Sequence, residues 1–282
     1  MTTAGQDSGP RRGQNSAFTA QRGQSSTRPN QRNILLVLAY DGTDFSGWQR
    51  LGGGARTVQK TLEDALSGLL GEKINVVGSG RTDAGVHADG QAANFWTQSA
   101  LSPAVLVARV NEVLPPDLAC VGAREAVPAF HARYRAVSKT YAYRFHDGPH
   151  PDPFVRRWSL HASTRLDERT IASVLAVLPG ERDFSALSNA KDDARGFVRN
   201  LSSAVVERQG DLVKVSFTAD GFLYNQARVM AACAFEAGSG RMDAATLSAI
   251  VGSRDRDRAP GALGAYGLRL VGVAYRDEDF LD

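Results

Sequence analysis

The sequence predicts an α+β protein built around one mostly antiparallel sheet with helices packed on one side. Two observations predict this class. Short apolar runs alternate with longer segments whose apolar residues recur at helical spacing, and the order β-α-β-β-α-β occurs twice along the 282-residue chain. We therefore expect two ferredoxin-like halves joined into one sheet, with a central cleft between them as the natural place for a functional site.

Composition and charge are those of an ordinary globular protein. Hydrophobic residues make up 43% of the sequence, and no apolar run approaches the roughly 20 residues that span a bilayer. The formal net charge is only +3, so a nucleic-acid surface must come from clustered Arg and Lys rather than from bulk charge. Cys120 and Cys233 lie far apart in apolar surroundings, which favours buried thiols and a reducing cytoplasm.

Three segments are expected along the chain. Residues 1–31 are rich in Gly, Ser, Gln and Arg and poor in apolar residues, so we expect a disordered basic tail. This tail is either a passive solvated segment or an arm that contacts nucleic acid. Residues 32–135 form the N-terminal α/β half, and residues 136–282 form the C-terminal α/β half, which completes the cleft.

In the first half, local signals mark both helices. Thr57 is a good N-cap for a helix with apolar residues at helical spacing, and Gly71 ends it. Ser102 favours the start of a second helix, which runs to Val113 before two prolines. The strands expected here are residues 33–40, 74–78, 91–97 and 118–126.

The second half repeats this order without obvious sequence identity to the first. A hairpin turn at residues 209–211 joins two runs of alternating pattern. The expected strands are residues 137–145, 201–208, 212–219 and 268–275, and the expected helices are residues 167–178, 221–237 and 243–251.

Residues 78–90 connect the second and third expected strands and place Arg, Asp and His between glycines. A turn that only reverses the chain needs two to five residues and no such chemistry. A dinucleotide-binding fingerprint is disfavoured because Asp83 stands where its third glycine belongs, and an anion there repels a pyrophosphate. A metal site at Asp83, His87 and Asp89 lacks further ligands to complete a coordination shell.

Two interpretations of this connection stay open on physical grounds alone. In one, Asp83 caps a turn while the glycines supply positive φ. In the other, Asp83 is a nucleophile or general base beside Arg81.

The same residues carry a resemblance to a known family. Residues 80–88 (GRTDAGVHA), with Gln91 and Phe95, closely resemble the active-site motif of the TruA family of bacterial tRNA pseudouridine synthases. The resemblance runs from about residue 33 to residue 275 in the family's order. Its further motifs are Tyr40–Arg50, Phe130–Tyr134, Lys139–Tyr141, Asp183–Phe184, Phe222–Met230 and Gly267–Leu268.

The resemblance implies the pseudouridine synthase fold with an active-site cleft. It also implies isomerisation of uridine to pseudouridine at positions 38, 39 and 40 of the tRNA anticodon stem-loop, without cofactor or metal. Asp83 matches the essential carboxylate, which either attacks the ribose C1′ or removes the 2′ proton to form a glycal. A homodimer is implied, in which one subunit helps to hold the tRNA that the other modifies. The alternatives are an RNA-binding module without catalysis and a synthase acting on other RNA uridines.

Four further residues match family positions around Asp83. Arg228 is expected to pair with Asp83, because an unpaired guanidinium among apolar neighbours is costly; the alternative is a surface or phosphate-binding arginine. Tyr141 is expected to stack on the flipped uracil, whereas an aromatic on a strand is otherwise a core residue. Arg81 is expected to fill the vacated space or to hold phosphate, and Leu268 to form an apolar wall of the pocket.

Other motif residues receive less specific expectations. His87 and Asp89 are expected to order the loop rather than to catalyse. A segment of basic residues interleaved with tyrosines suits a surface that tracks phosphates, or else a solvated edge strand. Its basic residues are Arg133, Arg135, Lys139 and Arg144.

The sequence departs from the family pattern at two places. Asn94 stands where the family often carries a histidine. Residues 262–265 (ALGA) replace the usual Thr-Ala-Pro-Ala run, which bears on the pocket wall leading to Leu268. Neither change is expected to touch Asp83, Tyr141 or Arg228.

Overall fold

The computed structural model describes residues 30–191, 193 and 196–281, so the expected basic tail up to residue 29 lies outside the described part of the chain. For description we call residues 32–135 the first half and the described residues after 135 the second half. In the first half, two α-helices separate four strands. They are β1 (Arg32–Tyr40), α1 (Val58–Leu70), β2 (Val77–Gly78), β3 (His87–Thr97), α2 (Pro103–Asn111) and β4 (Leu118–Ala126).

The second half adds six strands and three α-helices within the described residues. The elements are β5 (Ser138–His146), β6 (Leu160–His161), α3 (Glu168–Leu175), β7 (Gly180–Asp183), β8 (Val198–Gln209), β9 (Leu212–Ala219), α4 (Gln226–Gly238), α5 (Ala244–Ser253) and β10 (Leu268–Ala274).

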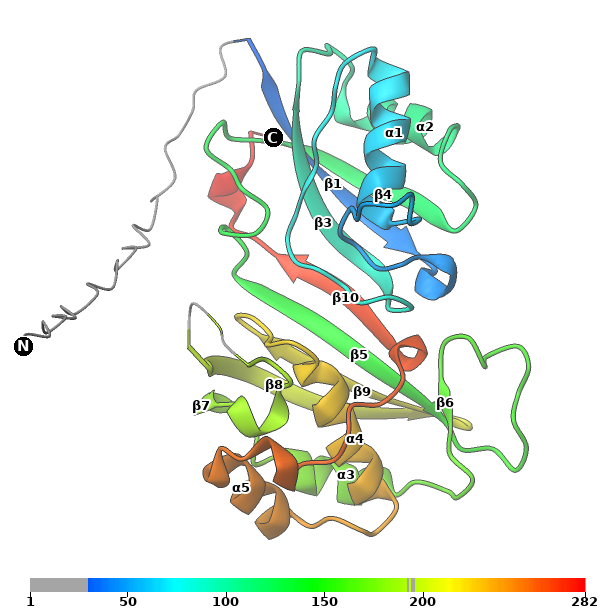
Figure 1. Ribbon diagram of the computed structural model, residues 1–282, viewed down its shortest axis with the longest axis vertical. Coiled ribbons are helices and arrows are strands. Elements are labelled where there is room, and N and C mark those ends of the chain that lie inside the picture. Colours follow the sequence, from blue (N-terminus) through cyan, green and yellow to red (C-terminus); the bar gives the residue numbers. More distant parts are fainter. Residues whose placement is uncertain (1–29, 192, 194–195, 282) are drawn as a thin grey trace, which may run out of the picture.

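All described strands belong to one sheet in the order β4-β1-β3-β10-β5-β9-β8-β7, with β2 paired to β3 and β6 to β5. The pairing is antiparallel except between β10 and β3 and between β5 and β6. Figure 1 shows α1 and α2 at one end of this sheet and α3, α4 and α5 at the other, with β10 and β5 between them. The expected class, a mixed α/β protein with a large and mostly antiparallel sheet, is confirmed.

Helix boundaries follow the capping residues. The Thr57 side chain accepts a hydrogen bond from the Lys60 N–H at the start of α1, and Gly71 ends this helix at φ 66°. Asp167 and Asp243 cap α3 and α5 in the same way. These side chains satisfy N–H groups that a helix leaves without a partner in its first turn.

Two expected elements begin several residues later in the structure than the sequence predicts. Of the strand expected at residues 74–78, only β2 is formed. The Ile74 N–H donates instead to the Ser67 hydroxyl, and the Val76 N–H donates to the Glu63 carboxylate, so side chains of α1 replace a neighbouring strand. The helix expected at 221–237 begins only at Gln226, because Asn225 has a left-handed φ of 60°.

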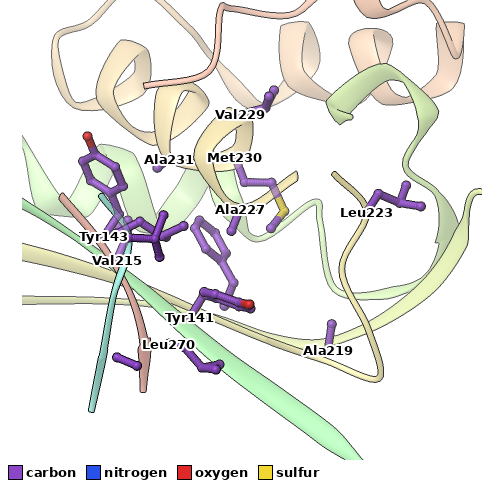
Figure 2. Packing of buried hydrophobic residues seen from close by; sticks show 14 of the residues in the cluster. Tyr141, Tyr143, Val215, Ala219, Leu223, Ala227, Val229, Met230, Ala231 and Leu270 are labelled. Atoms are coloured by element: carbon purple, nitrogen blue, oxygen red, sulfur yellow. The ribbon is translucent and has the colours of Figure 1, made fainter. Parts of the chain in front are cut away.

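One hydrophobic core extends across both halves of the sheet. It contains side chains from all five α-helices, among them Leu62 of α1, Leu106 of α2 and Met230 of α4. Figure 2 shows Ala227 and Met230 of α4 above Tyr141 of β5. On β1, Leu36 belongs to this core, while its neighbour Leu35 belongs to a smaller cluster. Because successive side chains of a strand point to opposite faces, the smaller cluster covers the other face.

The junction between the halves is narrow on the β3 side. β10 meets β3 at only two residue pairs, Arg269 with His87 and Leu270 with Ala88. On its other edge β10 is antiparallel to β5 along most of its length. In the described part of the chain, no helix combines the length and the apolar character needed to cross a membrane.

Candidate active site

A cleft of about 1160 Å³ opens between the two halves. Its walls come from residues 77–83 of the first half, residues 220–228 of the second, and residues 131–141 of the connection and β5. All five site residues expected from the sequence line it: Arg81, Asp83, Tyr141, Arg228 and Leu268. Among the described residues, no group of three or more His, Cys, Asp or Glu side chains is arranged to hold a metal ion.

Asp83 lies in a loop, residues 79–86, which we call the Asp83 loop. The Asp83 backbone carbonyl accepts a hydrogen bond from the Val86 N–H across a turn in which Gly85 has φ 79°. The preceding loop packs closely against this turn, since the Trp48 N–H donates to the Thr82 carbonyl at 3.0 Å. Gly47 makes this approach possible: it has φ 89°, and a Cβ there would lie 2.9 Å from the Thr82 oxygen.

Buried polar groups hold the inner side of the Asp83 loop. Gln91 of β3 is fully buried; its carbonyl oxygen accepts from the Ser79 hydroxyl, and its amide donates to the Gly80 carbonyl at 3.1 Å. From the second half, the Lys139 ammonium donates to the Ser79 carbonyl at 2.5 Å. The loop is therefore fixed from both halves without forming regular secondary structure.

Arg228 brings the second half to Asp83. Its Nη1 lies 3.3 Å from Asp83 Oδ2, and the side chains of Arg228 and Asp83 are 19% and 36% exposed. Nη1 also donates to Asn225 Oδ1 at 3.0 Å, and Nε donates to the Leu263 carbonyl at 2.7 Å. The contact between Arg228 and Asp83 that the sequence predicts is present.

The Leu263 contact corrects one expectation. Residues 262–265, the segment that departs from the family pattern, do touch Arg228, through the backbone carbonyl of Leu263. The next carbonyl, of Gly264, accepts from the Tyr143 hydroxyl at 2.9 Å. Because backbone atoms make both contacts, the altered side chains can leave the orientation of Arg228 unchanged.

Tyr141 lies on β5 at the bottom of the cleft and is 8% exposed. Its ring packs edge to face against the Phe222 ring, with the two centroids 4.9 Å apart. Burial raises the pKa of Tyr141 well above its usual value, and the nearby Tyr40 and Asp83 act in the same direction, so the hydroxyl stays protonated at neutral pH. Leu268, at the start of β10, is buried and supplies apolar surface to the same cleft.

Arg81 is exposed at the cleft and has no ion pair or hydrogen bond within the described residues. A guanidinium in this state keeps all its donors available for an anion.

We expected His87 and Asp89 to lie in the loop, but both are strand residues, because β3 begins at His87. His87 is buried; its Nδ1 accepts from the Gly42 N–H, and its Nε2 lies 3.0 Å from the carbonyls of Arg157 and Tyr266. This pattern requires a neutral ring with the proton on Nε2. Asp89 pairs with Arg269 at 2.7 Å.

The basic segment between the halves does not act as one surface. Arg133 and Lys139 line the cleft, whereas Arg135 pairs with Asp279 and Arg144 lies on the opposite face of β5 from Tyr141. The alternative of an edge strand is wrong, since β5 lies between β10 and β9.

Sequence reasoning assigned no role to several residues that shape the cleft. Asn94, noted only as a departure, is fully buried; it donates to Asn33 Oδ1 and accepts from the Ala132 N–H, which ties the connection between the halves to the sheet. Asn225 orients Arg228, and Tyr134 lines the cleft rim. The signal for Asn225 was available, because Asn tolerates the left-handed conformation that begins α4.

Known proteins match the chain over both halves. A family model described as tRNA pseudouridine synthase matches residues 36–135 and 174–276. The tRNA pseudouridine synthase A of Acetivibrio thermocellus is 38% identical over 86% of this chain and 100% of its own length. The proteins of that name from Caldicellulosiruptor saccharolyticus and Bacillus sp. (strain KSM-64) are 37% and 36% identical over 86% of this chain, and over 100% and 99% of their own lengths. A solved structure titled "Dye-decolorizing protein from V. cholerae" reaches a TM-score of only 0.18 at 10% identity, over 90% of this chain and 95% of its own.

The fold and the cleft thus define an α+β protein with a carboxylate and an arginine facing each other between its halves. The chain belongs to the tRNA pseudouridine synthase family. It is accordingly an enzyme of the isomerase class.

Proposed function

We propose that this protein isomerises uridine to pseudouridine at positions 38, 39 and 40 in the anticodon stem-loop of tRNA. The observation that carries the proposal is the pair of Asp83 and Arg228, which meets in the cleft of a chain from this family. An RNA-binding module without catalysis has no need for a carboxylate facing the phosphates of its ligand.

Asp83 is the catalytic nucleophile or base in this proposal. It either attacks the ribose C1′, displacing uracil with the bonding electrons, or removes the 2′ proton to give a glycal. The freed uracil turns and bonds to C1′ through C5. In the first route this bond displaces the Asp83 carboxylate from C1′, and in the second Asp83 returns its proton to C2′. The C5 proton then passes to solvent while N1 becomes protonated. Arg228 supports both routes, because its guanidinium lies 3.3 Å from the Asp83 carboxylate and holds that carboxylate in the cleft.

Tyr141 and Leu268 form the base pocket. The target nucleotide must leave its helix for C1′ to be reached, which costs a few kcal/mol, and stacking on an aromatic ring returns about 1–3 kcal/mol. Arg81 is well placed to replace the flipped base or to hold a phosphate, since its exposed guanidinium has no protein partner in the described part of the chain.

We further propose that the halves, residues 32–135 and 136–282, are two copies of one ferredoxin-like unit. The strand orders β4-β1-β3-β2 and β10-β5-β9-β8 support this, because both follow the order fourth, first, third, second. We propose three further properties: a basic tail at residues 1–31, a cytoplasmic location, and a homodimer in which one subunit helps to hold the tRNA that the other modifies. Gel filtration with light scattering tests whether the protein is a dimer.

The function is tested with purified protein and unmodified tRNA transcripts, by mapping pseudouridine at each position. We expect product at positions 38 to 40. If pseudouridine forms only at other uridines, the enzyme has a different target from the one proposed. If the protein binds tRNA but forms no pseudouridine, the non-catalytic alternative is supported.

Asp83→Ala separates chemistry from binding in the same assay. We expect product to fall by about a thousandfold or more while tRNA affinity stays within a few-fold. Loss of affinity by a variant that is still folded contradicts the role of Asp83 as nucleophile or base.

A further inference from the structure

The rim of the cleft carries an aromatic side chain that the chemistry above does not use. Tyr134 is 76% exposed, although it is one of the larger apolar side chains of the protein. It lines the same cleft as Asp83 but comes from the connection between the halves. An exposed ring at the edge of the cleft offers a surface for contact with a flat, apolar group.

The ring of Tyr134 is held in place rather than free. The Tyr134 N–H and the Arg135 N–H both donate to the His131 carbonyl, which closes a tight turn. The His131 ring packs on the Tyr134 ring with centroids 4.2 Å apart and planes 33° from parallel. His131 is itself fixed, because its Nδ1 accepts from the Arg133 N–H. The His131 ring thus supports one face of the Tyr134 ring, while most of the Tyr134 side chain remains exposed.

The turn stands on a rigid base. Phe130 and Ala132, on either side of His131, are 1% and 0% exposed, and the Ala132 N–H donates to the buried Asn94. A stacking surface that is already ordered loses little conformational entropy on binding.

Charge around Tyr134 identifies the occupant. Arg133 is exposed, and its guanidinium carbon lies over the Tyr134 ring, 6.0 Å from the centroid; it has no ion pair within the described residues. Arg81, equally exposed, lines the same cleft. An aromatic ring with one exposed guanidinium at its face and a second in the same cleft fits a nucleobase with its phosphate, because stacking and phosphate pairing act together in single-stranded RNA.

We propose that Tyr134 is a stacking platform for an unpaired base of the RNA substrate next to the target uridine, with Arg133 on the adjoining phosphate. This inference rests on the proposed function, since it takes RNA as the occupant of the cleft. Tyr134 holds the neighbour of the reacting nucleotide, whereas Tyr141 receives the reacting base itself.

The test uses the full chain and an anticodon stem-loop RNA that carries 2-aminopurine beside the target uridine. We expect Tyr134→Ala to raise the Kd by about 5- to 150-fold, the range for removing one stacked base from an aromatic ring, and Tyr134→Phe to stay within about twofold. Wild type and Tyr134→Phe should quench the 2-aminopurine emission, and Tyr134→Ala should not. Phe154→Ala is the matched control, since Phe154 is 84% exposed but is not among the residues that line the cleft.

The outcomes separate this inference from the function on which it rests. If wild type forms pseudouridine and Tyr134→Ala binds and quenches like wild type, the platform is wrong and the function stands. If wild type binds the RNA with quenching but forms no pseudouridine in any transcript, the platform stands and the function is wrong. Circular dichroism confirms that each variant is folded, and equal weakening by Phe154→Ala overturns the platform.

Discussion

The two walls of the cleft hold their charged residues in different ways. The Asp83 loop has no regular secondary structure; backbone hydrogen bonds, buried amides and close contacts at glycine fix it. Arg228 stands on α4, a helix in which most side chains are buried in the core shared by both halves. One wall is therefore held by polar contacts of specific geometry, and the other by apolar burial.

This difference predicts that mutations in the two walls have different effects, on the stability of the protein in one case and on the position of Asp83 in the other. Burial is shared among many atoms, so damage to the α4 wall is expected to lower the stability of the whole protein. The Asp83 loop depends on a few directed contacts, so damage there is expected to misplace a carboxylate while most of the fold persists.

Met230→Ala tests the α4 wall and should have the largest effect. Met230 is fully buried under the helix, so its truncation leaves a cavity and should lower the free energy of unfolding by about 2–5 kcal/mol. Urea unfolding followed by circular dichroism measures this. Glu236→Ala, on the same helix at a partly exposed ion pair with Arg241, should change it by less than about 1 kcal/mol. Similar losses in both variants would contradict the view that burial holds this wall.

Arg228→Met has the next largest expected effect and tests the contact between Arg228 and Asp83, where the two walls meet. It keeps the length of the side chain but removes the cation beside Asp83, so kcat should fall about 100-fold, equivalent to about 3 kcal/mol. Arg228→Lys should recover part of the rate, because one ammonium cannot reproduce the fork that reaches Leu263 and Asn225. Single-turnover rates at saturating tRNA measure both variants, and equal rates for Lys and wild type would show that charge alone suffices.

Elements of the first half and the start of α4 differ in how well the sequence predicts them. The ends of α1 follow from Thr57 and Gly71, and the strand at 118–126 is predicted to the residue, because local capping and alternation decide them. The start of α4 lies five residues later than predicted, because the left-handed Asn225 precedes it; Asn tolerates this conformation but does not by itself mark a helix start.

Contacts between segments far apart in sequence were the hardest to predict. The Asp83–Arg228 contact was expected only through family resemblance, and nothing local in residues 262–265 indicated that the Leu263 carbonyl reaches Arg228. The start of β3 at His87 likewise depends on pairing with β10, which lies some 180 residues away. Such pairings need the whole fold, so a single sequence carries little trace of them.

Gly47→Ala tests the support of the Asp83 loop. Gly47 and Gly53 both have positive φ, at 89° and 74°, so alanine strains the backbone at either site by about 1–2 kcal/mol. Only at Gly47 does the new Cβ meet the loop, 2.9 Å from the Thr82 carbonyl oxygen, whereas no atom lies within 4 Å at Gly53. We expect similar losses of stability in both variants but about a 10-fold loss of kcat in Gly47→Ala alone. Unfolding and single-turnover measurements on the pair decide this, and equal rates would show that the loop adapts.

His87 links the first half to the second and gives the smallest expected effect, a dependence of stability on pH. Burial lowers the pKa of His87 below 6.5, and Arg269 acts in the same direction, while Asp41 and two carbonyls act against it. The unfolded chain therefore binds a proton at a higher pH than the folded chain does. The free energy of unfolding is fully retained above about pH 6.5 and falls as the pH decreases toward the folded pKa, by at most about 1.4 kcal/mol per unit of pKa difference.

His87→Gln removes this group and should flatten the decrease in unfolding free energy between about pH 7 and pH 5. Burial also lowers the pKa of His131, so this group contributes to the remaining slope, and His87→Gln with His131→Gln should flatten it further. Urea titrations at several pH values measure the slopes. An unchanged slope in His87→Gln would mean that the ring takes up a proton in the folded state by giving up the Gly42 N–H. The neighbouring Asp41 carboxylate, 3.1 Å from Nδ1, would then become the partner of the protonated ring. The contacts of His87 with both halves would then persist at low pH.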